Sequence, residues 1–212
     1  DDAELDMIII WFILETGSRR GGATMVRIDD LIAATRVLSS RISREQGAWF
    51  IERAKTAPWD LVPPGTSLRD ADPCQIGGLY DHAAALFAHF RGAAPRGVRA
   101  AKVYKVLHLM RPELFPILDS RLARWYDAAA RAAAVELNEC RTDLPRAKYA
   151  YWAAVRNDLL ANADALVVLR TQVGGYSPAA QSALAVISDL RLLDIVTWDA
   201  ANPDEADDDT DS

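Results

Sequence analysis

Residues 95–125 read PRGVRAAKVYKVLHLMRPELFPILDSRLARW, and this stretch organises the rest of the chain. It predicts a tight turn at residues 96–99 and a helix over about 100–110. An apolar crossing bounded by prolines is expected over 111–118, because proline interrupts a helix. A further helix is then expected to start at Asp119 or at the residue after it. The pattern predicts a helix, a crossing, and a carboxylate at the mouth of the next helix.

A helical run over 79–91 precedes the turn, so the two helices and the turn between them predict a helix-hairpin-helix over about 79–133. Ala and Leu are abundant, which favours a mostly α fold. No interior linker divides the chain, and a single helical domain is expected over 7–198. The apolar run Met7–Leu14 predicts either a buried helix or a short N-terminal strand.

Helices are also expected on both sides of this centre. A capping box at Ser43 predicts a helix start there, and Trp59 in the proline-rich connection is expected to anchor on the core. C-terminal to the centre, the predicted helices cover 123–137, 146–161, 164–173 (ending at Gly174-Gly175) and a last run from Ser177-Pro178 to Trp198.

Charge is distributed unevenly along the chain. Residues 91–131 contain nine Lys or Arg and only three acidic residues. The overall net charge of -6 comes from acidic ends at 1–6 and 199–212, both expected to be disordered, while 7–198 carries five more basic than acidic residues. A basic centre favours a phosphate-rich partner, and a solvated helix face is the alternative.

Cysteine and histidine usage argues against a metal or a cofactor. Cys74 and Cys140 lie far apart without metal-ligand spacing, so no zinc site, iron–sulfur cluster or disulfide framework is expected. Reduced thiols and a cytoplasmic location are predicted instead. His82, His89 and His108 lack metal-binding spacing and are expected to be structural or surface residues. The run at Met7–Leu14 is too short to span a membrane.

The predicted hairpin turn has the chemistry of a phosphate site. Backbone N–H groups at the turn and at the start of the second helix would point toward one oxygen atom. Gly97 permits close approach, Val98 supplies an N–H, and Arg99, Lys102 and Lys105 add positive charge. The expected partner is therefore the DNA backbone, bound independently of sequence and with steep salt dependence.

Part of this stretch resembles the helix-hairpin-helix base-excision DNA glycosylases, on the residues Gly97-Val98 and Phe115-Pro-Ile-Leu-Asp119 at the spacing of that superfamily. The resemblance implies that Asp119 is the catalytic carboxylate, which stabilises charge on the sugar or activates water while the base is flipped out. Three features depart from the pattern. Arg99 replaces the second turn glycine, Ala101 stands where bifunctional members have a lysine, and a cysteine cluster is missing. The resemblance therefore implies a monofunctional glycosylase or a non-catalytic DNA binder, without lyase activity.

A second resemblance covers most of residues 15–198. The chain is similar to an actinobacterial family catalogued as domain of unknown function 6308, on three segments: Ile28-Asp-Asp-Leu-Ile-Ala, Gly97-Val-x-x-x-Lys102-x-x-Lys105-x-Leu107-x-x-x-Arg111-Pro112-x-Leu114-x-Pro116-x-x-Asp119, and Leu190-Arg-Leu-Leu-Asp-Ile-Val-Thr-Trp198. This resemblance implies one domain and no established activity.

Each of the main predictions has an alternative. Asp119 before a helix start is what N-capping alone would select. Arg111-Pro112 is expected to stop a helix with a solvated Arg. The function predicted is DNA binding through the hairpin, with base excision at Asp119 left open. The alternative is a non-enzymatic protein-interaction module, and a homo-oligomer or a protein partner is compatible with either.

Overall fold

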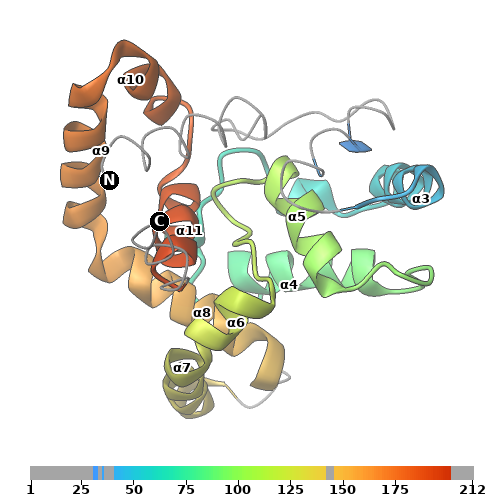
Figure 1. Ribbon diagram of the computed structural model, residues 1–212. Helices are drawn as coiled ribbons and strands as arrows, with labels where there is room; N and C mark the ends of the chain where they lie inside the picture. The colour runs from blue at the N-terminus through green and yellow to red at the C-terminus, as the bar shows by residue number, and fades with distance from the viewer. Residues whose placement is uncertain (1–30, 33–34, 36–40, 142–145, 202–212) are drawn as a thin grey trace, which may run out of the picture.

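The computed structural model describes residues 31–32, 35, 41–141 and 146–201 (Figure 1). Within these residues the protein is mostly α, with nine α-helices and two short 3-10 helices and no strand, as the sequence predicts. The elements in chain order are α3 (Arg44–Lys55), η1 (Trp59–Leu61), η2 (Leu68–Asp70), α4 (Leu79–Arg91), α5 (Ala100–Met110), α6 (Ser120–Trp125), α7 (Asp127–Cys140), α8 (Arg146–Ala161), α9 (Ala163–Tyr176), α10 (Pro178–Leu184) and α11 (Asp189–Ala200).

The helices are arranged with α9 and α10 at one end of the described molecule and α3 at the other (Figure 1). Between these ends, α4 packs against α5 and α3, and α7 packs against α8. Helix α11 contacts α6, α8 and α9, so it joins the C-terminal helices to the centre of the fold. The expectation that Met7–Leu14 forms a helix or a strand lies outside the described residues, as do those for 1–6 and 202–212. At the other boundary, α11 continues to Ala200, two residues past the predicted end of the helical domain.

The core is centred on Trp152 of α8, whose side chain is 1% exposed. Its ring lies 5.5–6.2 Å, centroid to centroid, from five aromatic rings. Those rings come from α4, α5, α8 and the segment after α5, and they belong to Tyr80, Phe87, Tyr104, Phe115 and Tyr149. Because edge-to-face aromatic contacts add to the burial of apolar area, this cluster joins α4 and α5 to α8 in one core.

Several helix boundaries match the sequence prediction. Helices α4, α5 and α8 begin and end where the sequence pattern places them. Ser43 caps α3 through a capping box with Gln46, with both hydrogen bonds formed. Ser177 caps α10, and Pro178 occupies the first turn. These boundaries depend on local hydrogen bonds and backbone angles, which the sequence encodes directly.

Three predicted boundaries are wrong, each for a tertiary reason. The helix expected over 123–137 breaks at Tyr126, a buried residue whose hydroxyl donates to Asp158 of α8 at 2.6 Å. The long C-terminal helix is interrupted at 185–188, where Ser188 caps α11. Helix α9 runs through Gly174-Gly175 instead of ending there. Gly174 faces α10, since a Cβ there would lie in ordinary van der Waals contact with Gln181 at 3.9 Å.

The cysteine prediction is also wrong. Cys74 and Cys140 form a disulfide, with their Cα atoms 5.5 Å apart. They are 66 residues apart in sequence, so no local spacing indicates the pairing. The fold brings them together because the loop before α4 lies against the C-terminal end of α7. Among the described helices, none is long and apolar enough to cross a membrane.

We expect Trp152→Ala to lower the free energy of unfolding by about 3–5 kcal/mol, because it removes the centre of the aromatic cluster and leaves a cavity. Chemical denaturation followed by circular dichroism measures this. The matched control is Trp125→Ala on α6, whose side chain is 50% exposed and should change stability by less than about 0.5 kcal/mol. Equal losses of stability in the two variants would contradict the assignment of Trp152 to the core.

Candidate functional site

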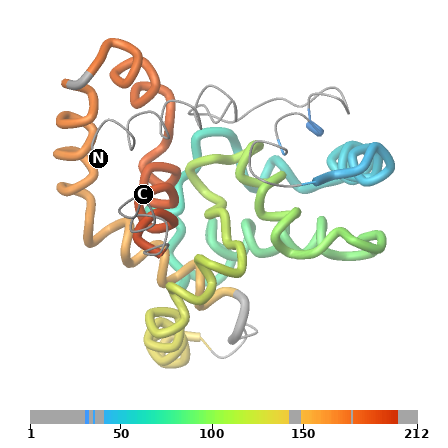
Figure 2. The backbone as a smooth tube through the Cα atoms, viewed as in Figure 1, coloured from blue at the N-terminus to red at the C-terminus, as the bar shows by residue number. Residues whose placement is uncertain are grey.

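The crossing at residues 111–118 leads from α5 to Asp119 and has no regular secondary structure (Figure 2). It is nevertheless buried at most positions, so its backbone groups need partners. One partner is His108 of α5, whose Nδ1 lies 2.8 Å from the carbonyl oxygen of Phe115. Burial lowers the pKa of His108 to about 3, so the ring is neutral and Nδ1–H donates to that carbonyl.

Helix α11 holds the crossing from the other side. The hydroxyl of Ser188 donates to the carbonyl oxygen of Pro112 at 2.9 Å. The carboxylate of Asp194 accepts from the N–H of Ile117 at 3.2 Å. The path of the chain into Asp119 is therefore set by side chains of two different helices.

Arg111 at the start of the crossing is not solvated, contrary to the sequence prediction. Its side chain is buried and donates to the carbonyl oxygen of Val62 at 2.7 Å. The guanidinium also lies 4.8 Å from the ring centre of Trp59, a cation–π contact. Trp59 is anchored on the core as predicted, because its indole N–H donates to Ala54 at 2.8 Å and its ring packs near Phe90.

Asp119 occupies the N-cap of α6. Its Oδ1 accepts from the N–H groups of Arg121 and Leu122, at 2.9 and 3.0 Å. The capping interpretation of Asp119 is therefore confirmed. Its other oxygen, Oδ2, accepts no hydrogen bond from the residues that the structure describes, and the side chain is only partly buried. A catalytic role for Asp119 stays a prediction.

A group of buried charges adjoins Asp119. Lys105 of α5 is 8% exposed, and Arg191 and Asp194 of α11 are 5% and 4% exposed. Burial lowers the pKa of Lys105, and the negative charge of Asp119 opposes that shift. Burial raises the pKa of Asp194 to about 7 and lowers that of Arg191 to about 10, while their mutual attraction partly offsets both shifts. The segment before Asp119 is thus flanked by charges shielded from water.

The sequence analysis missed Arg191 and Asp194, and it did not place His108 beside the crossing. A signal for the first two existed. They interrupt the apolar run of residues 190–195 at a spacing of three, which puts both on the same face of a helix as buried leucines. Charged residues on a buried face are rare unless they pair or hold backbone groups. Their target, the crossing, is visible only in the folded chain.

The turn between α4 and α5 carries the predicted phosphate-binding residues. Gly97 is exposed with φ +86°, and Arg99 is exposed at the N-cap of α5. Val98 is buried, and its N–H donates to the carbonyl oxygen of Pro95 at 3.0 Å. Lys105 is buried beside Asp119 and lies away from the turn. The fold therefore brings together Gly97, Arg99 and Lys102 and separates Lys105 from them.

Gln46 links this turn to α3. Its amide NH₂ donates to the carbonyl oxygen of Arg96 at 3.3 Å, and its Oε1 accepts from Lys102 at 2.7 Å. The start of α3 therefore lies beside the turn and the start of α5, in agreement with Figure 1. The positive φ at position 97 is what favours glycine there, and a Cβ at 2.9 Å from the Gln46 amide nitrogen would only require the end of that side chain to move.

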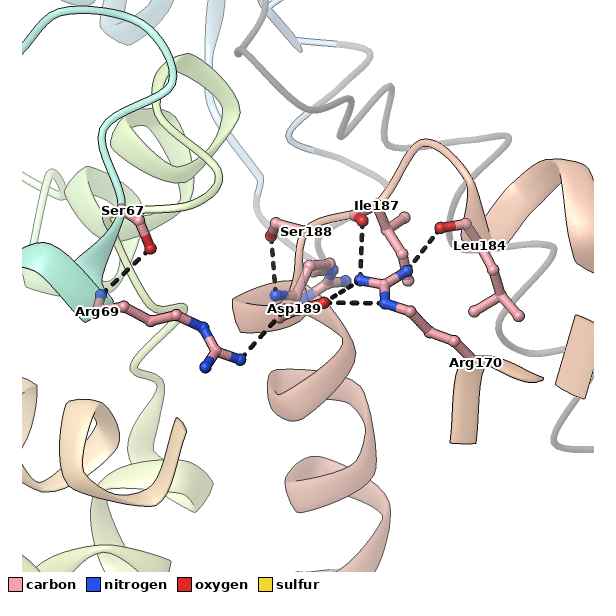
Figure 3. A network of polar contacts seen from close by, with 8 residues as sticks. Ser67, Arg69, Arg170, Leu184, Ile187, Ser188 and Asp189 are labelled. Carbon is pink, nitrogen blue, oxygen red and sulfur yellow. Dashed lines mark hydrogen bonds and ion pairs between the residues drawn. The ribbon is translucent and has the colours of Figure 1, made fainter. Parts of the chain in front are cut away.

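A second polar network lies at the start of α11 (Figure 3). Asp189 accepts from Arg170 of α9 at 2.6 Å and from Arg69 of η2 at 3.1 Å. Arg170 also donates to the backbone carbonyls of Leu184 and Ile187, which fixes the turn between α10 and α11. A cavity of about 290 Å³ adjoins this network, and none of the predicted site residues lines it.

The described residues define an all-helical protein in which an irregular crossing between two helices ends in a carboxylate that caps the second of them. The chain belongs to a family described as a family of unknown function, DUF6308, whose model matches residues 13–201. Comparisons with curated proteins and with solved structures found no match. This match confirms the resemblance to the DUF6308 family, while the actinobacterial origin and the glycosylase-like core stay predictions.

Among the described residues, no group of three or more His, Cys, Asp or Glu side chains is arranged to hold a metal ion. The buried charges near Asp119 are instead a mixture of basic and acidic groups. Such an arrangement positions the backbone that leads to Asp119, through the hydrogen bond from the N–H of Ile117 to Asp194. The chemistry that Asp119 can perform depends on which molecule reaches it from the solvent.

Asp194 and His108 make opposite contributions to the pH dependence of stability. Asp194, with its pKa raised from 3.8 to about 7, stabilises the fold fully below pH 3.8, and this contribution is lost as pH rises to 7. His108, with its pKa lowered from 6.5 to about 3, contributes fully above pH 6.5, and this is lost as pH falls to 3. Between pH 3.8 and 6.5, the stability contributed by Asp194 therefore falls as pH rises, while the stability contributed by His108 increases.

We expect Asp194→Asn to remove the contribution of Asp194 to the pH dependence of stability and to leave that of His108 in place. The free energy of unfolding of the variant, relative to wild type, should rise with pH between 3.8 and 7, by up to about 1.4 kcal/mol per pH unit. Urea denaturation over this range measures it. Asp199→Asn, an exposed substitution on the same helix, should follow the wild-type profile. A pH-independent difference for Asp194→Asn would show that its proton is not linked to folding.

Proposed function

We propose that the protein binds the DNA backbone through the turn surface, which consists of Arg96, Gly97, Arg99, Lys102 and the first turn of α3. The observation that carries this proposal is the start of α5. That helix has eleven residues and begins without a side-chain cap, next to an exposed glycine and two exposed arginines. In that first turn the N–H of Lys102 donates to the carbonyl oxygen of Arg99 at 3.1 Å, and the N–H groups of Ala100 and Ala101 before it are available to an anion from solvent.

The start of α3 adds to this surface. Gln46 joins it to the turn, so the positive ends of two helix dipoles lie on the same part of the molecule. Arg41 and Arg44 flank Ser43 at that helix start and are exposed, with Glu45 as the acidic residue of the first turn. Successive phosphates of one strand would meet the two helix starts and the cations between them.

A second candidate function, base excision, rests on Asp119. The observation that favours it is the different surroundings of the two oxygens of this carboxylate. Oδ1 is held by the backbone of α6, while Oδ2 accepts no hydrogen bond from the described residues. A carboxylate fixed in this way can stabilise positive charge that develops on a sugar as the base departs, or orient a water molecule. The negative charge of Asp119 in turn opposes the lowering of the Lys105 pKa that burial causes, so the two groups interact.

We expect Arg96→Ala/Arg99→Ala to weaken binding to duplex DNA and to make the dependence on salt shallower. The slope of log affinity against log salt should fall by roughly 0.9 for each phosphate that the variant no longer neutralises, so by roughly 2 for the pair. Fluorescence anisotropy over a salt series measures this. Arg131→Ala, on α7 away from the turn (Figure 1), removes an exposed cation and should leave both the affinity and the slope unchanged.

Two outcomes would contradict the proposal. Wild-type protein that does not bind DNA even at low salt would exclude the turn surface as a DNA site, and would favour the protein-interaction alternative. An equal loss of affinity in the Arg131→Ala control would show that binding depends on overall charge and not on this surface.

We expect Asp119→Asn to change the preference of the protein for a duplex carrying an abasic-site analogue while leaving its affinity for undamaged duplex unchanged. Asn also caps helices well, so α6 should remain intact. Competition binding with the two duplexes measures the preference, and circular dichroism checks the fold. Equal binding of both duplexes by wild type and variant would leave Asp119 with a capping role only.

A further inference from the structure

The disulfide joins two segments that are distant in sequence. Cys74 lies in the loop between η2 and α4, and Cys140 is the last residue of α7. Both residues are exposed. The disulfide therefore joins two surface residues and lies outside the core, with the Sγ of Cys140 3.6 Å from the carbonyl oxygen of Leu137.

The same two segments are joined a second time, without sulfur. Arg141 follows Cys140, and its side chain is only 2% exposed. Its guanidinium donates to the carbonyl oxygen of Pro73 at 3.2 Å and to the carboxylate of Asp81 in α4 at 2.6 Å. Asp81 also accepts from the N–H of Gly77 at 2.6 Å, which ties the loop to the start of α4. Together these hydrogen bonds form the Arg141 clamp.

The two links differ in what breaks them. The disulfide joins two exposed residues, and thiol exchange can break it. The Arg141 clamp is a hydrogen-bonded ion pair buried at the guanidinium, and none of its hydrogen bonds involves a sulfur atom. Breaking such a pair by removing one partner is costly, because the other charge stays buried. The junction therefore has a covalent link that can open and a non-covalent link that holds it in place.

We propose that Cys74 and Cys140 form a reversible redox site, which exchanges with small thiols and their disulfides while the Arg141 clamp keeps the junction assembled in both states. This inference is independent of DNA binding. It also differs from a purely structural disulfide, whose reduction would unfold the junction.

The exchange proceeds through two displacements. An external thiolate attacks one exposed sulfur, the bond between Cys74 and Cys140 breaks, and a mixed disulfide forms with release of the other cysteine as a thiolate. A second external thiolate then attacks the mixed disulfide and releases the first cysteine. The protein gains two electrons and, after protonation, two thiols, while the two external thiols become one disulfide. The reverse sequence, with a small disulfide as oxidant, restores the bond.

Reduction has a defined consequence for stability. The disulfide closes a loop that contains α4, α5, the crossing, α6 and α7, and closing a long loop restricts the unfolded chain. Its reduction should therefore lower stability without changing the native hydrogen bonds of the clamp. The proposal predicts a folded, less stable reduced form.

The test uses the full chain equilibrated in glutathione redox buffers, quenched by alkylation and analysed by mass spectrometry. We expect both thiols to appear together as the buffer becomes more reducing and to disappear on reoxidation. Helical circular dichroism should be retained in the reduced protein, with the midpoint of thermal unfolding lowered by roughly 5–15 °C. Two alkylatable thiols under all oxidising conditions, or disappearance of the helical signal on reduction, would overturn the proposal.

Variants test the Arg141 clamp. Arg141→Met should stay folded when oxidised and should lose helical signal or show a far lower unfolding midpoint when reduced. Arg131→Met, an exposed substitution on α7, should behave as wild type in both states.

A second variant covers the case in which Arg141→Met does not fold at all. Cys74→Ser removes the disulfide and leaves the clamp intact, so it should match the reduced wild type in fold and in unfolding midpoint. A reduced Arg141→Met protein as stable as reduced wild type, or an unfolded Cys74→Ser protein, would refute the role of the clamp.

Discussion

The fold depends on how a buried, irregular segment satisfies its backbone. Residues 111–118 cross the protein interior outside any helix or sheet, with turn hydrogen bonds only from Leu114 and Phe115 to Arg111. An unpaired buried N–H or carbonyl costs about as much as a missing hydrogen bond. Side chains of His108, Ser188 and Asp194 supply partners for this backbone. One of these residues lies on α5 and two lie at or in α11, so the same three hydrogen bonds also join the centre of the fold to its C-terminal helices.

The hydrogen bonds to residues 111–118 require ionisable side chains in the interior, at positions where a core usually has apolar side chains such as leucine. Asp194 must be buried to reach the N–H of Ile117, and Arg191 and Lys105 accompany it. Buried charges are retained when they make hydrogen bonds that apolar side chains cannot replace. Asp119 follows directly from the segment so held. The geometry of the proposed site and the stability of the crossing therefore depend on one set of residues.

The turn surface and the disulfide junction lie at the two ends of α4. At one end, Gln46 and Gly97 bring two helix starts together with exposed arginines around them. At the other end, Arg141 and the Cys74–Cys140 bond hold the loop before α4 against α7. Residues outside α4 therefore fix the chain at both ends of this helix. As a result, the turn that follows α4 has a defined position.

The sequence by itself determined the helices whose ends are local events. The bounds of α4, α5 and α8, the capping of α3 by Ser43 and the capping of α6 by Asp119 all depend on residues that are close together in the chain. Only the tertiary structure decided what the buried polar groups touch. Lys105 is buried by helices remote from it in sequence, Asp194 reaches a backbone N–H 77 residues away, and Cys74 pairs with a cysteine 66 residues further on. Packing between distant segments makes these contacts, and no local pattern records it.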